Sequence, residues 1–213
     1  MAIERTGSVD IGANIGYDTL LASARVGRAG QVVAIEASPR TFELLQRNLA
    51  LNATSVNVRA VHAAVSDKPG TLALYEINEG NIGAATTLAS RGGTLTASIE
   101  ALPLDQILTA DEIQRLRLIK MDVEGAEPPI LRQILNQLSI YPPTMDIVVE
   151  ASPQDDFPAW CDVFDQLRAA GFSAWTIDND YELDWYLRWR HPTALHRVET
   201  MPAHQQDLLF TRR

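Results

Sequence analysis

Four acidic residues stand at the ends of predicted strands, where they could carry out chemistry. They are Asp10, Glu36, Asp122 and Glu150. A carboxylate can accept hydrogen bonds from hydroxyls, take a proton from a reacting group or hold a divalent cation. Because the carboxyl ends of parallel strands meet at one edge of a sheet, we expect these four side chains to gather at that edge.

A glycine-containing turn follows the first of these acids. The stretch VDIGANIG places Gly12 and Gly16 between a predicted strand and a predicted helix. Glycine lets the backbone approach a ligand closely, and such a turn aims the first free N–H groups of the helix at the ligand. Ala13 and Asn14 stand where the dinucleotide fingerprint needs its second glycine, which disfavours a pyrophosphate and a dinucleotide oxidoreductase. A nucleotide-like cofactor is expected here, and a purely structural turn is the alternative.

Two later strand ends provide features that a nucleoside needs. Glu36 lies twenty residues after Gly16, a spacing at which a carboxylate can accept both hydroxyls of a ribose. Its alternative role is to favour the N-terminus of the next helix. Ala64 and Val65 end the third predicted strand and leave room for an adenine ring, whose amine could meet Asp67. A surface turn is the alternative for that segment.

The elements that must position these residues alternate between strands and helices. After the strand at Val9, apolar runs predict strands at residues 31–35, 56–65, 71–77, 116–123, 146–150, 172–177 and 208–211. Amphipathic stretches predict helices between most of them. This alternation implies right-handed crossovers and therefore an α/β fold with a mainly parallel sheet and helices on both faces.

The composition limits the classes of partner. The 213 residues carry a formal net charge of -9, so we expect no nucleic acid partner. No window approaches the roughly 18 apolar residues of a membrane span, and Cys161 is the single cysteine, which suits a cytoplasmic protein. We expect one domain over residues 1–213, with a short N-terminus and irregular segments at 78–98 and 178–206. The sequence leaves the oligomeric state open.

Four stretches occur in a fixed order: VDIGANIG (9–16), AIEASP (34–39), AAVSDKPG (63–70) and IKMDVEGAE (119–127). Together with the closing DLLF (207–210), they resemble the FkbM-type branch of class I S-adenosylmethionine-dependent methyltransferases. The resemblance implies a Rossmann-like fold with a mainly parallel seven-stranded sheet and an antiparallel last strand. It also implies S-adenosylmethionine as cofactor and O-methylation of a sugar or natural-product hydroxyl.

The resemblance also suggests which residues bind the cofactor. Asp10 would lie near the ammonium of its methionyl part, and turn N–H groups would lie near its carboxylate. The expected cofactor-binding residues are Asp10, Gly12, Ala13, Asn14, Gly16, Glu36, Ala37, Ala64, Val65, Asp67 and Asp122.

Methyl transfer to a hydroxyl requires positioning and the removal of a proton. Asp122 and Glu124 leave a strand and enter a glycine turn, so either could be the base while the other orients the substrate. The expected catalytic residues are Glu124, Asp122 and Glu150. The alternatives are a Mg²⁺ or Ca²⁺ held by the same three residues, where we expect a metal-free site, and simple capping of the helix that follows, with Glu127 favouring its dipole.

Two functions remain open at this point. The first is a methyltransferase acting on a small-molecule hydroxyl acceptor. The second is a non-catalytic cofactor-binding or scaffold protein that retains the fold. The reason for considering it is that the family commonly has a longer segment before the first strand, which helps to cover the site, whereas the N-terminus of this sequence is short. Acceptor specificity is expected to lie in residues 78–98 and 178–206.

Overall fold

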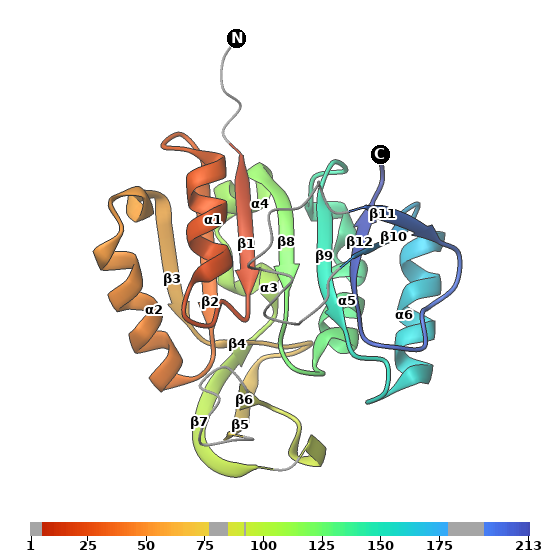
Figure 1. Cartoon of the computed structure of the whole chain (residues 1–213), viewed down its shortest axis with the longest axis horizontal. Coiled ribbons are helices and arrows are strands. Elements are labelled where there is room, and N and C mark those ends of the chain that lie inside the picture. Colours follow the sequence, from red (N-terminus) through yellow and green to blue (C-terminus); the bar gives the residue numbers. More distant parts are fainter. Residues whose placement is uncertain (1–5, 77–84, 92, 179–193) are drawn as a thin grey trace.

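The computed structural model describes residues 6–76, 85–91, 93–178 and 194–213, and a large mixed sheet dominates them (Figure 1). Within these residues the sheet has eight strands in the order β11-β10-β12-β9-β8-β1-β2-β3. Their bounds are β1 Gly7–Ile11, β2 Gln31–Glu36, β3 Val58–His62, β8 Leu116–Met121, β9 Asp146–Ala151, β10 Ser173–Ile177, β11 Leu195–Val198 and β12 Gln206–Thr211.

Strand directions confirm the predicted Rossmann-like arrangement. Strands β3, β2, β1, β8 and β9 pair in parallel, whereas the last strand, β12, runs antiparallel between β9 and β10. The eighth strand, β11, was not predicted and lies inside the segment 178–206 that we expected to be irregular. It forms an exposed edge whose first three residues are all solvent-accessible, so the sequence carries no burial pattern that would reveal it.

Helices cover both faces of the main sheet. Their bounds are α1 Tyr17–Val26, α2 Pro39–Leu51, α3 Leu104–Ile107, α4 Ala110–Arg115, α5 Glu127–Asn136 and α6 Phe157–Ala169. Along β2, Val33 and Ile35 belong to the buried cluster that includes residues of α4, α5 and α6, whereas Ala34 packs with Leu45 of α2. Because successive strand residues point to opposite faces, the two clusters lie on opposite sides of the sheet.

Local sequence signals explain where several helices begin. Ser38 caps α2 by accepting a hydrogen bond from the Thr41 N–H, and Pro39 occupies the first turn. A capping box starts α4, with Thr109 and Glu112 bonding reciprocally. None of the helices in the described ranges is long and apolar enough to cross a membrane.

A second, smaller sheet lies below the carboxyl ends of the parallel strands of the main sheet in Figure 1. Its order is β4-β7-β5-β6, with β4 Ala64–Val65, β5 Gly70–Glu76, β6 Ala85–Thr86 and β7 Thr94–Leu102. The predicted strand at 56–65 is therefore wrong in extent, because the chain leaves the main sheet after β3 and enters the second sheet at β4.

The expectation of an irregular segment at 78–98 is wrong for residues 94–98, which begin β7. These residues pair with β5, and most are exposed, so pairing with a distant strand stabilises them and burial leaves no periodic pattern. Residues 78–84, 92 and 179–193 of the two expected irregular segments lie outside the described residues, as does residue 77 at the end of the predicted strand 71–77.

Candidate active site

A narrow crevice lies beyond the carboxyl ends of β1, β2 and β8. This is where ligands bind in open parallel sheets. Among the residues that line it are eight of those predicted from the sequence: Gly12, Asn14, Glu36, Ala37, Ala64, Val65, Asp122 and Glu124. The crevice measures about 70 Å³, which is smaller than the ~300–1,000 Å³ of typical ligand pockets.

The glycine turn is shaped by contacts inside the chain. A Cβ added to Gly12 would lie 1.8 Å from the carbonyl oxygen of Asp122, and Gly12 has a φ of 75°. The N–H groups of Gly12 and Ala13 both donate to the Ile35 carbonyl at 3.0 Å, and the Gly16 N–H donates to Ala13. These three amides are therefore bonded within the chain and shape the turn.

Ala13 and Gly16 face α2 and not the crevice. Ala13 packs with Ala34 and Leu45, and a Cβ on Gly16 would lie 2.7 Å from the Leu45 side chain. Both residues therefore set the path of the turn against α2, and their role in cofactor binding stays a prediction.

Glu36 is positioned by two backbone amides. Its Oε2 accepts a hydrogen bond from the Asn14 N–H and its Oε1 accepts one from the Ser38 N–H, both at 2.8 Å. The side chain is 8% exposed, and burial raises its pKa while the two amides oppose that rise. Each carboxylate oxygen can accept a second hydrogen bond, so Glu36 retains the capacity to bind hydroxyls.

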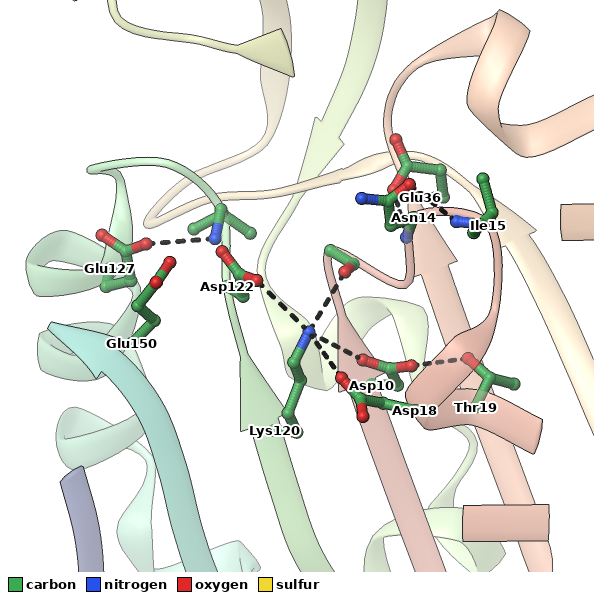
Figure 2. A network of polar contacts seen from close by, with 12 residues as sticks. Asp10, Asn14, Ile15, Asp18, Thr19, Glu36, Lys120, Asp122, Glu127 and Glu150 are labelled. Atoms are coloured by element: carbon green, nitrogen blue, oxygen red, sulfur yellow. Dashed lines mark hydrogen bonds and ion pairs between the residues drawn. The ribbon is translucent and has the colours of Figure 1, made fainter. Parts of the chain in front are cut away.

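A lysine that the sequence reasoning missed joins several of the acidic residues in one polar network (Figure 2). The Lys120 ammonium is 3.5 Å from Asp10, 3.6 Å from both Asp18 and Asp122, and 3.4 Å from the Gly12 carbonyl oxygen. Burial lowers the pKa of Lys120, but the neighbouring carboxylates raise it by a larger amount. The pKa therefore lies above its ordinary value, and the residue stays charged. The available signal was a lysine in a buried strand two positions before Asp122, which places both side chains on the same face.

Asp10 is enclosed behind this lysine. It is 2% exposed, accepts a hydrogen bond from the Thr19 hydroxyl at 2.5 Å, and does not line the crevice. Burial raises its pKa, and Lys120 and Thr19 oppose the rise. The ammonium beside Asp10 is that of Lys120, so its expected contact with a cofactor ammonium stays a prediction.

Asp122 and Glu150 point toward one another from neighbouring strands in Figure 2. Burial raises the pKa of Asp122 to about 6, Lys120 opposes the rise, and the nearby Glu150 adds to it. Glu150 accepts a hydrogen bond from the Gln205 side chain at 2.7 Å. Glu124 lines the crevice with a left-handed φ of 57°, and its carbonyl accepts a hydrogen bond from Thr86 at 2.9 Å.

The metal alternative finds no support in this geometry. Within the described part of the chain, no three His, Cys, Asp or Glu side chains converge as a group that could hold a metal ion. Asp122, Glu124 and Glu150 therefore do not form the ligand set considered above, and the cation nearest to Asp122 is the Lys120 ammonium.

Glu127 lies at the start of α5, where the sequence predicts an acid that favours the helix dipole. Its Oε1 accepts hydrogen bonds from the Val123 N–H at 3.0 Å and the Gly125 N–H at 3.2 Å. The residue is 1% exposed, and burial raises its pKa to about 7. Glu127 therefore also holds the turn that carries Glu124 along the crevice.

Asp67 lies away from the crevice, unlike the other residues of the predicted adenine wall. Ala64 and Val65 line the crevice, but the strand they form pairs with β7, and the Ser66 N–H donates to the Leu102 carbonyl at 3.0 Å. This pairing carries the following turn into the second sheet, so Asp67 lines a different cavity.

Comparisons with known proteins give separate evidence on the family and the fold of this chain. The model of the methyltransferase FkbM domain matches residues 10–174. The methyltransferase sdnD of Sordaria araneosa is 29% identical over 154 residues, which make up 59% of this chain and 59% of that relative. The chain thus spans less than two thirds of this curated relative.

Solved structures share the fold at low identity. Methyltransferase FkbM from Methylobacillus flagellatus KT superposes with a TM-score of 0.57 at 14% identity, over 97% of this chain and 44% of that one. Precorrin-6y C5,15-methyltransferase from Geobacter metallireducens GS-15 superposes with a TM-score of 0.53 at 14% identity, over 98% of this chain and 80% of that one. These likenesses confirm the class I methyltransferase fold. Because the domain match covers most of the chain and includes the crevice with its carboxylates, this chain belongs to the FkbM methyltransferase domain family.

Proposed function

We propose that this domain binds S-adenosylmethionine in the crevice and transfers its methyl group to a hydroxyl of a small molecule, such as a sugar or a natural product. The observation that carries this proposal is that Glu36 and Asp122 line the same crevice at the carboxyl ends of β2 and β8, inside the matched family domain. The net charge of -9 favours a small-molecule acceptor over nucleic acid.

The lining residues suit a nucleoside with an amino-acid tail. Glu36 is fixed by two amides and retains acceptor capacity for the ribose hydroxyls. Ala37, Ala64 and Val65 offer small apolar side chains for the adenine ring. Gly16 is the N-cap residue of α1. Because glycine has no side chain that could cap the helix, the positive end of the helix stays open to the cofactor carboxylate.

Proton removal is assigned to Asp122. When bound, the cofactor would supply an electrophilic methyl group on a sulfonium. With a pKa of about 6, Asp122 is mostly ionised at pH 7 and more basic than an ordinary aspartate, so it can take the acceptor's hydroxyl proton. Glu150 raises the basicity of Asp122, and Glu124, on the crevice wall, orients the acceptor hydroxyl.

The test combines binding and turnover. Calorimetry should show that folded protein binds S-adenosylmethionine, and mass spectrometry should detect deuterated methyl groups on members of a panel of hydroxyl compounds. A folded protein that does not bind the cofactor would overturn the proposal. Binding without transfer to any acceptor would instead favour a non-catalytic cofactor-binding protein.

A further inference from the structure

A second cavity adjoins the crevice, and no step proposed so far uses it. It measures about 720 Å³ and lies between the second sheet and the first turns of α5 and α6. Val65, Thr87 and Ala126 line both the crevice and this cavity, so the two spaces meet at these residues. Its volume falls within the range of ~300–1,000 Å³ that is typical of pockets for small organic ligands.

The walls of the second cavity are largely apolar. The second sheet and the turn before it contribute Pro69, Leu72 and Ala101, whereas Pro128 and Pro129 come from the start of α5. Proline has no N–H, so this part of the α5 wall offers no backbone donor to a ligand. A wall of this kind binds hydrocarbon by excluding water, not by hydrogen bonding.

The charged residues of the cavity are exposed and mainly acidic. Asp67, Asp155 and Asp156 face a single basic residue, Lys68, among the residues that line it. Asp156 also caps α6 by accepting a hydrogen bond from the Ala159 N–H at 3.0 Å. The formal charge of these four side chains is therefore -2, which repels anionic compounds.

We propose that the second cavity binds the acceptor, and that the acceptor is an uncharged compound with an apolar body and at least one hydroxyl. The apolar body lies against Leu72 and the two prolines, and the hydroxyl points toward Asp122 past Thr87 and Ala126, which line both spaces. This inference rests on the proposed function. It excludes sugar phosphates and nucleotide-linked sugars as preferred acceptors, because the acidic residues repel them.

The test fills the cavity without touching the crevice. Thr71 is an exposed residue of β5 that lines the cavity, and tryptophan suits a strand, so Thr71→Trp blocks the space with little effect on folding. The matched control is Thr94→Trp on β7, which is exposed and lines neither space. Thermal unfolding followed by circular dichroism checks that both variants fold.

Octyl glucoside, glucose and glucose 1-phosphate serve as probes, and their binding is measured by saturation-transfer NMR with S-adenosylhomocysteine present. We expect octyl glucoside to bind at least about tenfold more tightly than glucose, and glucose 1-phosphate to bind most weakly. Thr71→Trp should weaken octyl glucoside binding by about tenfold or more, whereas Thr94→Trp should not change it. Calorimetry should show unchanged S-adenosylmethionine binding in both variants.

Two results would overturn the inference. One is unchanged octyl glucoside binding in folded Thr71→Trp, and the other is binding of glucose 1-phosphate as tight as that of octyl glucoside. Failure of the proposed function looks different, because the wild-type protein would then either not bind S-adenosylmethionine or bind it without transferring a methyl group to any acceptor.

Discussion

The crevice and the second cavity meet at three residues but are built in different ways. In the crevice region, the polar groups are bonded within the chain: the buried Glu36 accepts hydrogen bonds from two amides, and the partly buried Lys120 lies among three carboxylates. In the second cavity, the walls are apolar and the charges are exposed. Buried, bonded groups select one ligand geometry, whereas an apolar space tolerates many shapes. Under the two proposals above, the crevice would select the cofactor and the second cavity would select the acceptor.

The largest expected effect is on the chemical step in the crevice. Asp122→Asn should lower kcat by about 10²–10⁴-fold, because the amide cannot take the hydroxyl proton, and this loss should be much larger than any change in the Kd of the cofactor. Single-turnover assays and calorimetry measure the two quantities. Asp165→Asn, an exposed residue of α6, is the control. A full-rate Asp122→Asn enzyme would remove Asp122 as the base.

The same assignment predicts a pH dependence. The pKa of Asp122 is raised to about 6, so its base form is lost as the pH falls below that value. Below pH 6, kcat should fall by about tenfold per pH unit, and above pH 7 Asp122 should limit it no further. A profile without this acid limb would contradict the assignment, provided that circular dichroism shows folded protein throughout.

Glu127 holds the turn between the crevice and the cavity through its hydrogen bonds to Val123 and Gly125. Val123 and Glu124 of this turn line the crevice, whereas Gly125 lines the cavity. The folded protein retains the proton of Glu127 up to a pKa of about 7, against 4.5 for an ordinary glutamate. The folded state therefore binds more protons between these values, and stability falls as the pH rises through this window, by up to about 3 kcal/mol.

Glu127→Gln should remove this pH-dependent loss, so its free energy of unfolding relative to wild type should rise from pH 4.5 to pH 7.5. Urea unfolding at several pH values measures the difference. Parallel curves for the two proteins would show that the carboxyl already ionises in the fold at its ordinary pKa.

Cofactor affinity should respond to Glu36. Glu36→Gln leaves one acceptor oxygen and no charge, and hydrogen bonds to charged groups contribute ~1.5–3 kcal/mol, so the Kd for S-adenosylmethionine should rise by roughly 10–100-fold. The matched control is Glu43→Gln on the exposed face of α2. Equal Kd values for the two folded variants would exclude Glu36 from ribose binding.

The smallest effect on cofactor binding is expected at Asp67, which lines the cavity and not the crevice. Asp67→Asn should change the Kd for S-adenosylmethionine by less than about twofold, because the residue lies outside the cofactor space. A large loss of cofactor affinity, measured by calorimetry, would instead show that Asp67 contributes to adenine binding, and that the crevice and the cavity do not have separate ligands.

Local patterns predicted much of the main sheet and the crevice. Asp10, Glu36, Asp122 and Glu150 all lie at strand ends because parallel strands with right-handed crossovers bring their carboxyl ends to one edge. The four short stretches identified the family, and the domain match confirmed that resemblance. These features depend on residues close in sequence or on general rules of chain topology.

The other features of the fold and the site could not be predicted from the sequence, because they depend on contacts between residues far apart in the chain. The two-residue strand at Ala64 and Val65 exists because it pairs with Ala101 and Leu102, and such a pairing leaves no local signal. It removes Asp67 from the crevice. Lys120 was overlooked because its neighbours are those of a buried strand, and its role depends on carboxylates from β1 and α1.

The Lys120 cluster has a consequence for turnover. Three carboxylates surround one ammonium, so the formal charge of this cluster is -2. S-adenosylmethionine carries a net positive charge, whereas S-adenosylhomocysteine, left after transfer, is neutral overall. Under the proposed function, the cluster attracts the charged form and loses that attraction once the methyl group has gone, so the chain weakens product inhibition by electrostatics alone.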